Sequence, residues 1–344
     1  MNHFHSTRHI ITIIVLTVLF LVLAVACLLF GSVDIPAASV MDIVMGRSSG
    51  NVAWDIIIGQ SRLPMITTAA LAGAALSVSG LLLQTTFNNP LAGPSILGVS
   101  TGAGLGVAIV MLATGGTVST ILGTSAGSYI ATLLGALLGA GLVLIILITF
   151  SAIVRSSTML LIIGILISYL AASIISLLNS VANEEGIHSY VTWGFGNFSG
   201  VSVEQMPVYS LSIIVSLIAA VLMVKPLNAL LLGTRYAENL GVNTHRTRNV
   251  LLVITGVLTA VVTAFCGPIG FLGLVVPHVA RFMTATSNHA TLLPTTILAG
   301  ADVALLCTLI SVNGAHGIIP INAITPIIGV PIIIYIILRE LRRT

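Results

Sequence analysis

The sequence predicts an all-α, polytopic membrane protein with about ten transmembrane helices, and three observations support this prediction. Of the 344 residues, 57% are hydrophobic and 6% are charged, whereas a soluble domain carries about 25% charged residues. The mean hydropathy is +1.15, which is too high for a water-soluble fold of this length. The apolar residues form continuous runs of about 20 residues, as transmembrane helices require, and not the short alternating strands of a membrane barrel.

About ten apolar runs are the predicted spans, and together they predict a single membrane domain over residues 1–344. The fourth run is long and is therefore expected to tilt. Glycines in the third and fourth runs are predicted to let helices approach closely. The predicted spans are residues 10–30, 63–83, 95–113, 121–150, 158–178, 206–224, 251–266, 267–283, 292–312 and 323–338.

The basic residues predict the orientation, because cytoplasmic loops carry an excess of Lys and Arg. The polar segment 225–250 holds a third of the twelve basic residues, so we place it in the cytoplasm. Alternation from there leaves only Arg47 and Arg62 outside, and it puts both chain termini in the cytoplasm. The long polar segments 31–61 and 179–205 are then expected on the outer face.

The segment 225–250 is the longest polar interruption of the chain, and its pattern predicts two short helices and a turn. Pro226 can open the first helix, and Gly241 suits the left-handed conformation that ends a helix. Asn243 or Thr244 can cap the next helix. We interpret the segment as a helical hairpin by which a cytoplasmic partner moves the membrane part. The alternative is a solvated loop that only anchors the topology.

Several kinds of chemistry are absent from the sequence or only weakly indicated. A P-loop needs a Lys after Gly, but the only Lys is Lys225, which follows Val224. Any energy from a nucleotide must therefore come from another chain. Ser100 lies in a G-x-S-x-G pattern, but a glycine-rich helix favours packing over a serine hydrolase. His278 lacks an H-E-x-x-H frame, so no metal site is predicted.

Asp302 is the one carboxylate deep within a predicted span. Acids inside membranes are often functional, so an ion-coupled secondary transporter that uses Asp302 is the alternative function. The residue could also face a water-filled cavity or bond to a neighbouring helix. Cys27, Cys266 and Cys307 lie in apolar runs, so a disulfide framework is not expected. The basic residues are scattered at helix ends, and nucleic acid is not an expected partner.

Three blocks of sequence resemble the membrane permeases of the type II ABC importers for iron siderophores, haem and cobalamin. The blocks are Arg62-Leu63-Pro64 with residues 69–106, residues 227–248, and residues 267–283 with a tail at 324–339. The resemblance implies a ten-span permease that forms a homodimer in the inner membrane of a bacterium. It also implies two ATPase subunits, which bind the ATP and Mg, and a periplasmic or lipid-anchored substrate-binding protein. The chain itself would hold no cofactor and would not be an enzyme.

The resemblance further implies which residues couple the permease to the ATPase, and where the path is gated. Alternating access would follow from ATP-driven movement of the hairpin and reopening of the gate. Residues matching the coupling loop of the family are Ala237, Leu240, Gly241 and Val242, with polar contacts from Arg235, Glu238, Arg246 and Arg248. The inner gate is expected at two turns, with Asn88, Asn89 and Pro90 in one and Ser156 and Ser157 in the other.

In the same family, basic residues on the outer face seat the binding protein through salt bridges. Arg62 fits such a place, and Arg47 is a second candidate. The predicted loop 313–322 contains no Arg, although the resemblance implies one there in a cobalamin permease. This difference favours an iron chelate or haem over cobalamin. Specificity is expected to lie mainly with the delivery protein.

Overall fold

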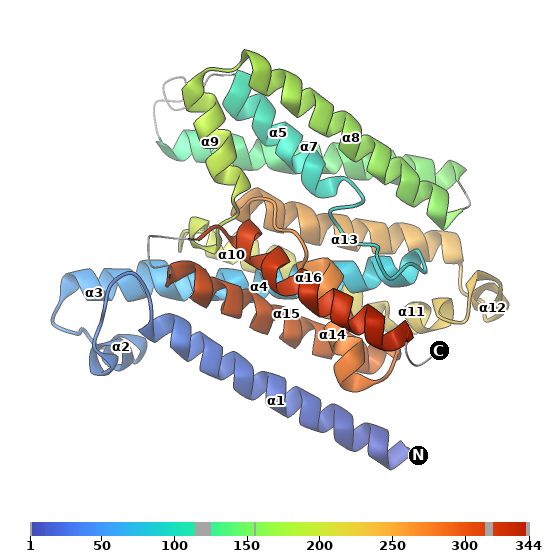
Figure 1. Cartoon of the computed structure of the whole chain (residues 1–344), viewed down its shortest axis with the longest axis horizontal. Coiled ribbons are helices and arrows are strands. Elements are labelled where there is room, and N and C mark those ends of the chain that lie inside the picture. The colour runs from blue at the N-terminus through green and yellow to red at the C-terminus, as the bar shows by residue number, and fades with distance from the viewer. Residues whose placement is uncertain (1, 114–124, 155, 314–318, 342–344) are drawn as a thin grey trace.

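The computed structural model describes residues 2–113, 125–154, 156–313 and 319–341, and every regular element in those ranges is a helix (Figure 1). This confirms the predicted all-α class. The helices are α1 (Asn2–Leu29), α2 (Ala37–Val44), α3 (Val52–Ile56), the π-helical segment η1 (Ile57–Arg62), α4 (Leu63–Thr86), α5 (Val99–Ala113), α7 (Ser125–Ile153), α8 (Ser157–Val181), α9 (Glu184–Gly194), the 3-10 turn η2 (Phe198–Gly200), α10 (Met206–Leu222), α11 (Val224–Leu230), α12 (Thr234–Asn239), α13 (Thr244–Cys266), α14 (Leu272–Thr284), α15 (His289–Val312) and α16 (Ile321–Leu341).

Each predicted span contains an apolar helix. In the described ranges, six helices are long and apolar enough to cross a membrane, and α10 with α11 makes a seventh span if the bent pair is counted as one. Three shorter apolar helices correspond to the predicted third, eighth and tenth spans. The longest continuous helix joins α3, η1 and α4 and covers 35 residues, Val52–Thr86.

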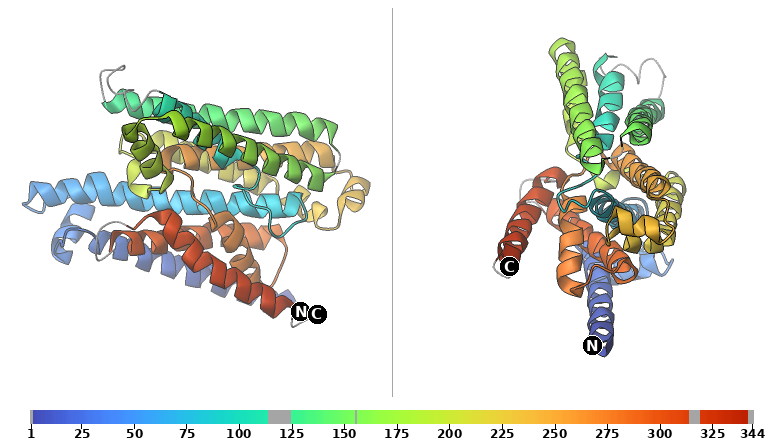
Figure 2. Two further views of the ribbon diagram at one scale, coloured as in Figure 1. Left: turned by 45° about the horizontal axis from the view of Figure 1, so that its top comes forward. Right: turned by 90° about the vertical axis from the view of Figure 1, so that its right-hand side faces the viewer.

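The core forms around α4, α13 and α15, which are the most buried of the long helices. Figure 2 shows α4 in the middle of the bundle, whereas α1 and α8 lie at its margins. Glycines let these helices touch through their backbones. A Cβ on Gly73 would collide with the carbonyl of Gly300 on α15, and a Cβ on Gly106 with the carbonyl of Gly135 on α7. The glycines of the third and fourth predicted spans therefore allow close helix approach, as expected, and the structure shows that these two helices are each other's partners.

Both chain termini and the pair α11–α12 lie at one end of the bundle, at the right-hand side in Figure 1 and in the left view of Figure 2. We call α11 and α12 the hairpin and this end the hairpin end. Gly241 has φ +83°, and the Asn243 side chain accepts a hydrogen bond from the Arg246 N–H at 2.9 Å. Both predicted turn features are thus confirmed, and Pro226 lies in the first turn of α11.

The structure differs from the prediction at the start of the seventh span and within the polar segments. The seventh span was expected from residue 251, but α13 begins at Thr244, because the Asn243 cap starts the helix before its apolar part. Arg246 and Arg248 consequently lie on the first turns of a spanning helix. The polar segments expected on the outer face also contain short helices, α2 and α9, rather than only loop.

Candidate functional site

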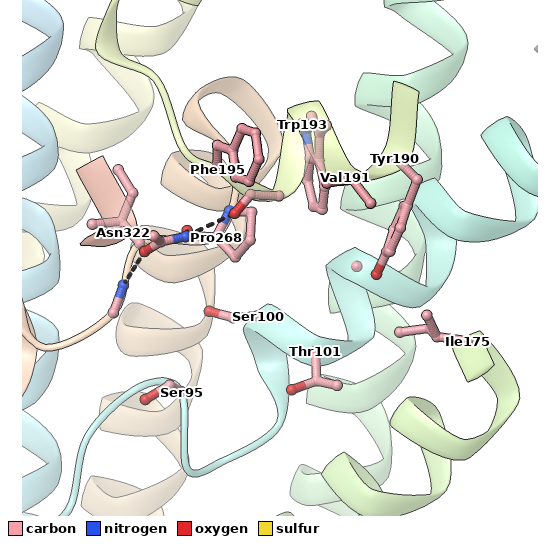
Figure 3. Close-up of a pocket in the computed structure, with 14 residues that line it drawn as sticks. Ser95, Ser100, Thr101, Ile175, Tyr190, Val191, Trp193, Phe195, Pro268 and Asn322 are labelled. Carbon is pink, nitrogen blue, oxygen red and sulfur yellow. Dashed lines mark hydrogen bonds between the residues drawn. The ribbon is translucent and has the colours of Figure 1, made fainter. Parts of the chain in front are cut away.

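A cavity of about 490 Å³ opens between α5, α8, α9, the turn before α14 and the start of α16 (Figure 3). None of its lining residues carries a formal charge. The rings of Tyr190 and Trp193 stack at one side with centroids 6.1 Å apart. Burial raises the pKa of the Tyr190 phenol. The lining is Ser95, Ser100, Thr101, Gly104, Ile175, Tyr190, Val191, Trp193, Gly194, Phe195, Pro268, Ile269, Gly270 and Asn322.

Asn322 holds three walls of this cavity together (Figure 3). Its amide nitrogen donates to the Gly194 carbonyl at the end of α9, at 2.9 Å, and to the Pro268 carbonyl. Its amide oxygen accepts from the Gly270 N–H at 3.1 Å. One side chain at the start of α16 thus joins α9 to the turn between α13 and α14. The sequence analysis missed this residue, whose only signal was a polar amide directly before an apolar run.

The hairpin presents large apolar side chains to its surroundings. Leu232, Tyr236 and Leu240 are 60%, 67% and 63% exposed, and Arg235 and Glu238 are exposed among them. Exposed apolar side chains rimmed by charge are typical of a protein contact. The exposed positions of Leu240, Arg235 and Glu238 suit the predicted coupling role, which remains a prediction.

Two of the predicted coupling residues lie inside the protein instead. Ala237 is fully buried, so it can shape the hairpin but cannot contact a partner. Arg248 is 8% exposed, and its guanidinium donates to the Ser151 hydroxyl at 3.0 Å and to the Ser151 and Val154 carbonyls at 2.6 and 3.0 Å. Arg248 therefore ties α13 to the end of α7, which corrects its prediction as a polar contact with an ATPase.

The remaining coupling candidates lie at the surface near the junction of α12 and α13. Arg246 and Gly241 are exposed, and Val242 is half-buried. The Glu238 carboxylate accepts from the Thr244 hydroxyl at 2.8 Å, which joins the end of the hairpin to the start of α13.

The first predicted gate lies in the turn 87–94, between α4 and α5. Asn88 has φ +45°, a left-handed conformation that asparagine tolerates. The Asn89 side chain accepts from the Leu91 N–H at 2.9 Å, and the Pro90 carbonyl accepts from His278 Nε2 at 2.9 Å. These bonds hold the turn in place, while its gating role remains a prediction.

The second predicted gate lies between α7 and α8. The Ser156 hydroxyl caps α8 by accepting from the Met159 N–H at 3.4 Å. Ser157 is the first residue of α8, and its side chain lies outside the described part of the structure, as does Arg155.

The two predicted docking residues differ in exposure. Arg47 is exposed in the turn after α2. Arg62 is 4% exposed, and its guanidinium donates to the Leu28, Leu29 and Val33 carbonyls, the first two at 2.5 and 3.2 Å. A cation at the end of α1 complements the partial negative charge of the helix terminus. The structure thus corrects the expectation of a surface salt bridge at Arg62.

The remaining candidates show no arrangement suited to catalysis. Asp302 is 3% exposed, and neither carboxylate oxygen has a hydrogen-bond partner among the described residues. The Ser100 hydroxyl lies 3.3 Å from that of Thr263. His278 bonds to a backbone carbonyl, and no group of His, Cys, Asp or Glu in the described ranges could hold a metal ion.

Comparison with known proteins identifies the family. The FecCD transport family matches residues 18–339. The vitamin B12 import system permease protein BtuC of Salmonella paratyphi A (strain ATCC 9150 / SARB42) is 34% identical over 290 residues, covering 84% of this chain and 85% of the relative. BtuC of Escherichia coli O9:H4 (strain HS) matches with the same identity and coverage.

A solved structure described as an inward-facing, metal-chelate type ABC transporter matches with a TM-score of 0.82 at 29% identity, covering 95% of this chain and 98% of that chain. The fold and the family therefore agree over nearly the whole sequence. The apolar helices of this chain and its enterobacterial relatives identify it as a multi-pass protein of the inner membrane. The chain belongs to the FecCD transport family of ABC importer permeases.

Proposed function

We propose that this chain is the permease of an importer for a metal chelate, a class that includes ferric siderophores, haem and cobalamin. The observation that carries the proposal is the exposed apolar hairpin on a chain without a P-loop. Leu232, Tyr236 and Leu240 are exposed on a segment expected to lie in the cytoplasm, and a separate ATPase subunit is the partner that would cover them. Two permease copies, two ATPase subunits and a binding protein form the proposed assembly.

The cavity beside α9 supports a bulky substrate that passes without tight binding. Its lining offers hydroxyls, an amide and stacked aromatic rings but no fixed charge. A neutral wall of this kind makes no strong ion pair with a chelate, so the substrate is not trapped on its way through. The selection of one chelate over another is then the task of the binding protein.

Proteoliposomes containing the chain, its ATPase and its binding protein test the proposal. We expect uptake of one of three probes, namely radiolabelled cobalamin, ferric siderophore or haem, and only with ATP inside the vesicle. Uptake driven by a proton gradient without the ATPase would contradict it. Accumulation of cobalamin alone would overturn the preference for an iron compound.

Arg246→Glu tests the hairpin end as the ATPase contact, because it reverses an exposed charge beside the hairpin. We expect less ATPase to co-purify with this variant. Arg47→Glu makes the same change at the opposite end and serves as the matched control. Equal ATPase co-purification in the two variants would remove the coupling role from Arg246.

A further inference from the structure

A continuous set of hydrogen bonds runs from the hairpin toward the turn 87–94. It begins at Asn228 on α11. The Asn228 side-chain oxygen accepts from the His289 main-chain N–H at 2.8 Å and contacts His289 Nδ1 at 2.9 Å. Its side-chain nitrogen donates to the side-chain oxygen of Asn288 at 2.9 Å. A single amide therefore attaches α11 to the first turn of α15.

The bonds around Asn228 determine the role of each ring nitrogen of His289. Because the Asn228 oxygen accepts the main-chain N–H, it also acts as an acceptor toward Nδ1, which must carry a proton. In the neutral ring, Nε2 is then an acceptor. The Thr85 hydroxyl lies 2.9 Å from Nε2 and 3.0 Å from the Leu81 carbonyl, so its single proton is shared between these two acceptors. His289 is 1% and Thr85 8% exposed, so this bond is shielded from water.

Thr85 lies in the last turn of α4, directly before the turn 87–94. The neighbouring Gln84 accepts from Arg281 on α14 through its side-chain oxygen at 2.6 Å. The Gln84 carbonyl accepts from the Asn89 N–H at 3.0 Å. On the far side of the same turn, His278 of α14 contacts the Pro90 carbonyl at 2.9 Å. The end of α4 and α14 together hold the turn.

The hairpin is also positioned to move. α11 meets α10 at a bend of 53°, and the break between the two helices lies at Met223. A bend of this kind allows α11 to tilt without rotation of the whole span. Its bonds to α15, followed by the contact of His289 with Thr85 on α4, would then carry the tilt inward, because breaking a buried hydrogen bond leaves unsatisfied polar groups.

We propose that Asn228, His289 and Thr85 are positioning residues that transmit movement of the hairpin to the turn 87–94. This inference rests on the proposed function, since the ATPase is the source of the movement. The three side chains act as one rigid linkage between α11, α15 and α4. None of them lines the cavity beside α9, so we expect the linkage to affect coupling and not recognition.

The test uses the complete complex with its ATPase in nanodiscs, with a spin label at Leu91→Cys in both permease copies. Leu91 is 51% exposed on the turn, whereas Cys27, Cys266 and Cys307 are nearly fully buried. Pulsed electron paramagnetic resonance measures the label-to-label distance without nucleotide and with MgATP and vanadate. ATP hydrolysis and ATPase co-purification are measured on the same samples.

We expect complexes with Asn228→Ala or Thr85→Val to bind the ATPase and hydrolyse ATP as the parent does. They should lose the nucleotide-driven change in the distance between the labels at Leu91. The fraction of complexes that show the nucleotide-bound distance should fall roughly three-fold or more, within the range that mutations along coupling networks produce. Asn228→Asp keeps the acceptor toward His289, and Thr85→Ser keeps the hydroxyl, so both should retain the change. Thr17→Val makes the same substitution as Thr85→Val at an exposed position on α1 and is the matched control.

Three outcomes would overturn the linkage. The first is a parent-like distance change in Asn228→Ala and Thr85→Val. The second is loss of ATPase binding in Asn228→Ala, which would make Asn228 a docking residue. The third is an equal loss of the distance change in the conservative variants (Asn228→Asp and Thr85→Ser) and in Asn228→Ala and Thr85→Val, which would indicate a packing defect. If the parent itself binds no ATPase, the proposed function fails as well, which distinguishes the two failures.

Discussion

Replacing Asn322 with Ala should loosen the wall of the cavity beside α9. The change removes the donor toward the Gly194 and Pro268 carbonyls and the acceptor for the Gly270 N–H. The main-chain bond from the Asn322 N–H to the Phe195 carbonyl remains. Each lost bond contributes about 0.5–1.5 kcal/mol, so the three together contribute about 1.5–4.5 kcal/mol to keeping these segments together, and about 2 kcal/mol lies near the low end of that range.

Cys266 reports on this loosening, because it ends α13 directly before the turn that Asn322 holds. Its thiol is 3% exposed, and a maleimide reacts with it only when the region opens. If opening is local, about 2 kcal/mol corresponds to a roughly 30-fold faster reaction. The assay is the labelling rate of Cys266 in a protein whose other two cysteines are replaced by Ala.

Two further variants make the test specific. Asn322→Asp keeps the acceptor for Gly270 but loses the donor, and its labelling rate should be intermediate. Asn313→Ala removes the same kind of side chain at an exposed position directly after α15 and should leave the labelling rate unchanged. Labelling of Cys266 at the parental rate in Asn322→Ala would refute the reasoning.

Three other predictions follow from buried contacts. Arg62→Leu removes the donor to the carbonyls at the end of α1 and should lower the free energy of unfolding by about 3 kcal/mol or more. The thermal midpoint in detergent should fall accordingly, whereas that of Arg47→Leu should not. Gly106→Val should cost about 3 kcal/mol by forcing α5 away from Gly135, whereas Gly141→Val, with open space around it, should purify normally; equal yields would contradict the close packing. Arg248→Gln should lower the thermal midpoint while ATPase co-purification persists, and loss of the ATPase at an unchanged midpoint would restore Arg248 as a contact.

The spans could be predicted because each needs only a sufficiently long apolar run, a property that a single sequence displays directly. The turn chemistry of Gly241 and Asn243 was predictable for a similar reason, since a positive φ and a helix cap depend on neighbouring residues. The start of α13 was missed because Arg246 and Arg248 ended the apolar run while the backbone continued as helix. Helix α9 was missed because it lies within a polar segment.

The roles of Arg62, Arg248 and Asn322 could not be predicted, because their partners lie far away in the sequence. Arg62 bonds to carbonyls about 30 residues earlier, and Arg248 to Ser151 nearly 100 residues earlier. The positive-inside rule assigns a side of the membrane to an Arg, but it does not separate an exposed guanidinium from one that closes a helix end. Tertiary packing decides between them.

The helix that runs from Val52 to Thr86 has a consequence for how a soluble protein reaches this permease. Its 35 residues extend about 50 Å at 1.5 Å per residue. A bilayer measures about 40–45 Å with its headgroups. At the average tilt of about 20°, this helix is still several ångströms longer than the bilayer, so its α3 end, which lies opposite the hairpin (Figure 1), is expected to reach beyond the headgroups. A delivery protein could dock on that projecting end without dehydrating any lipid.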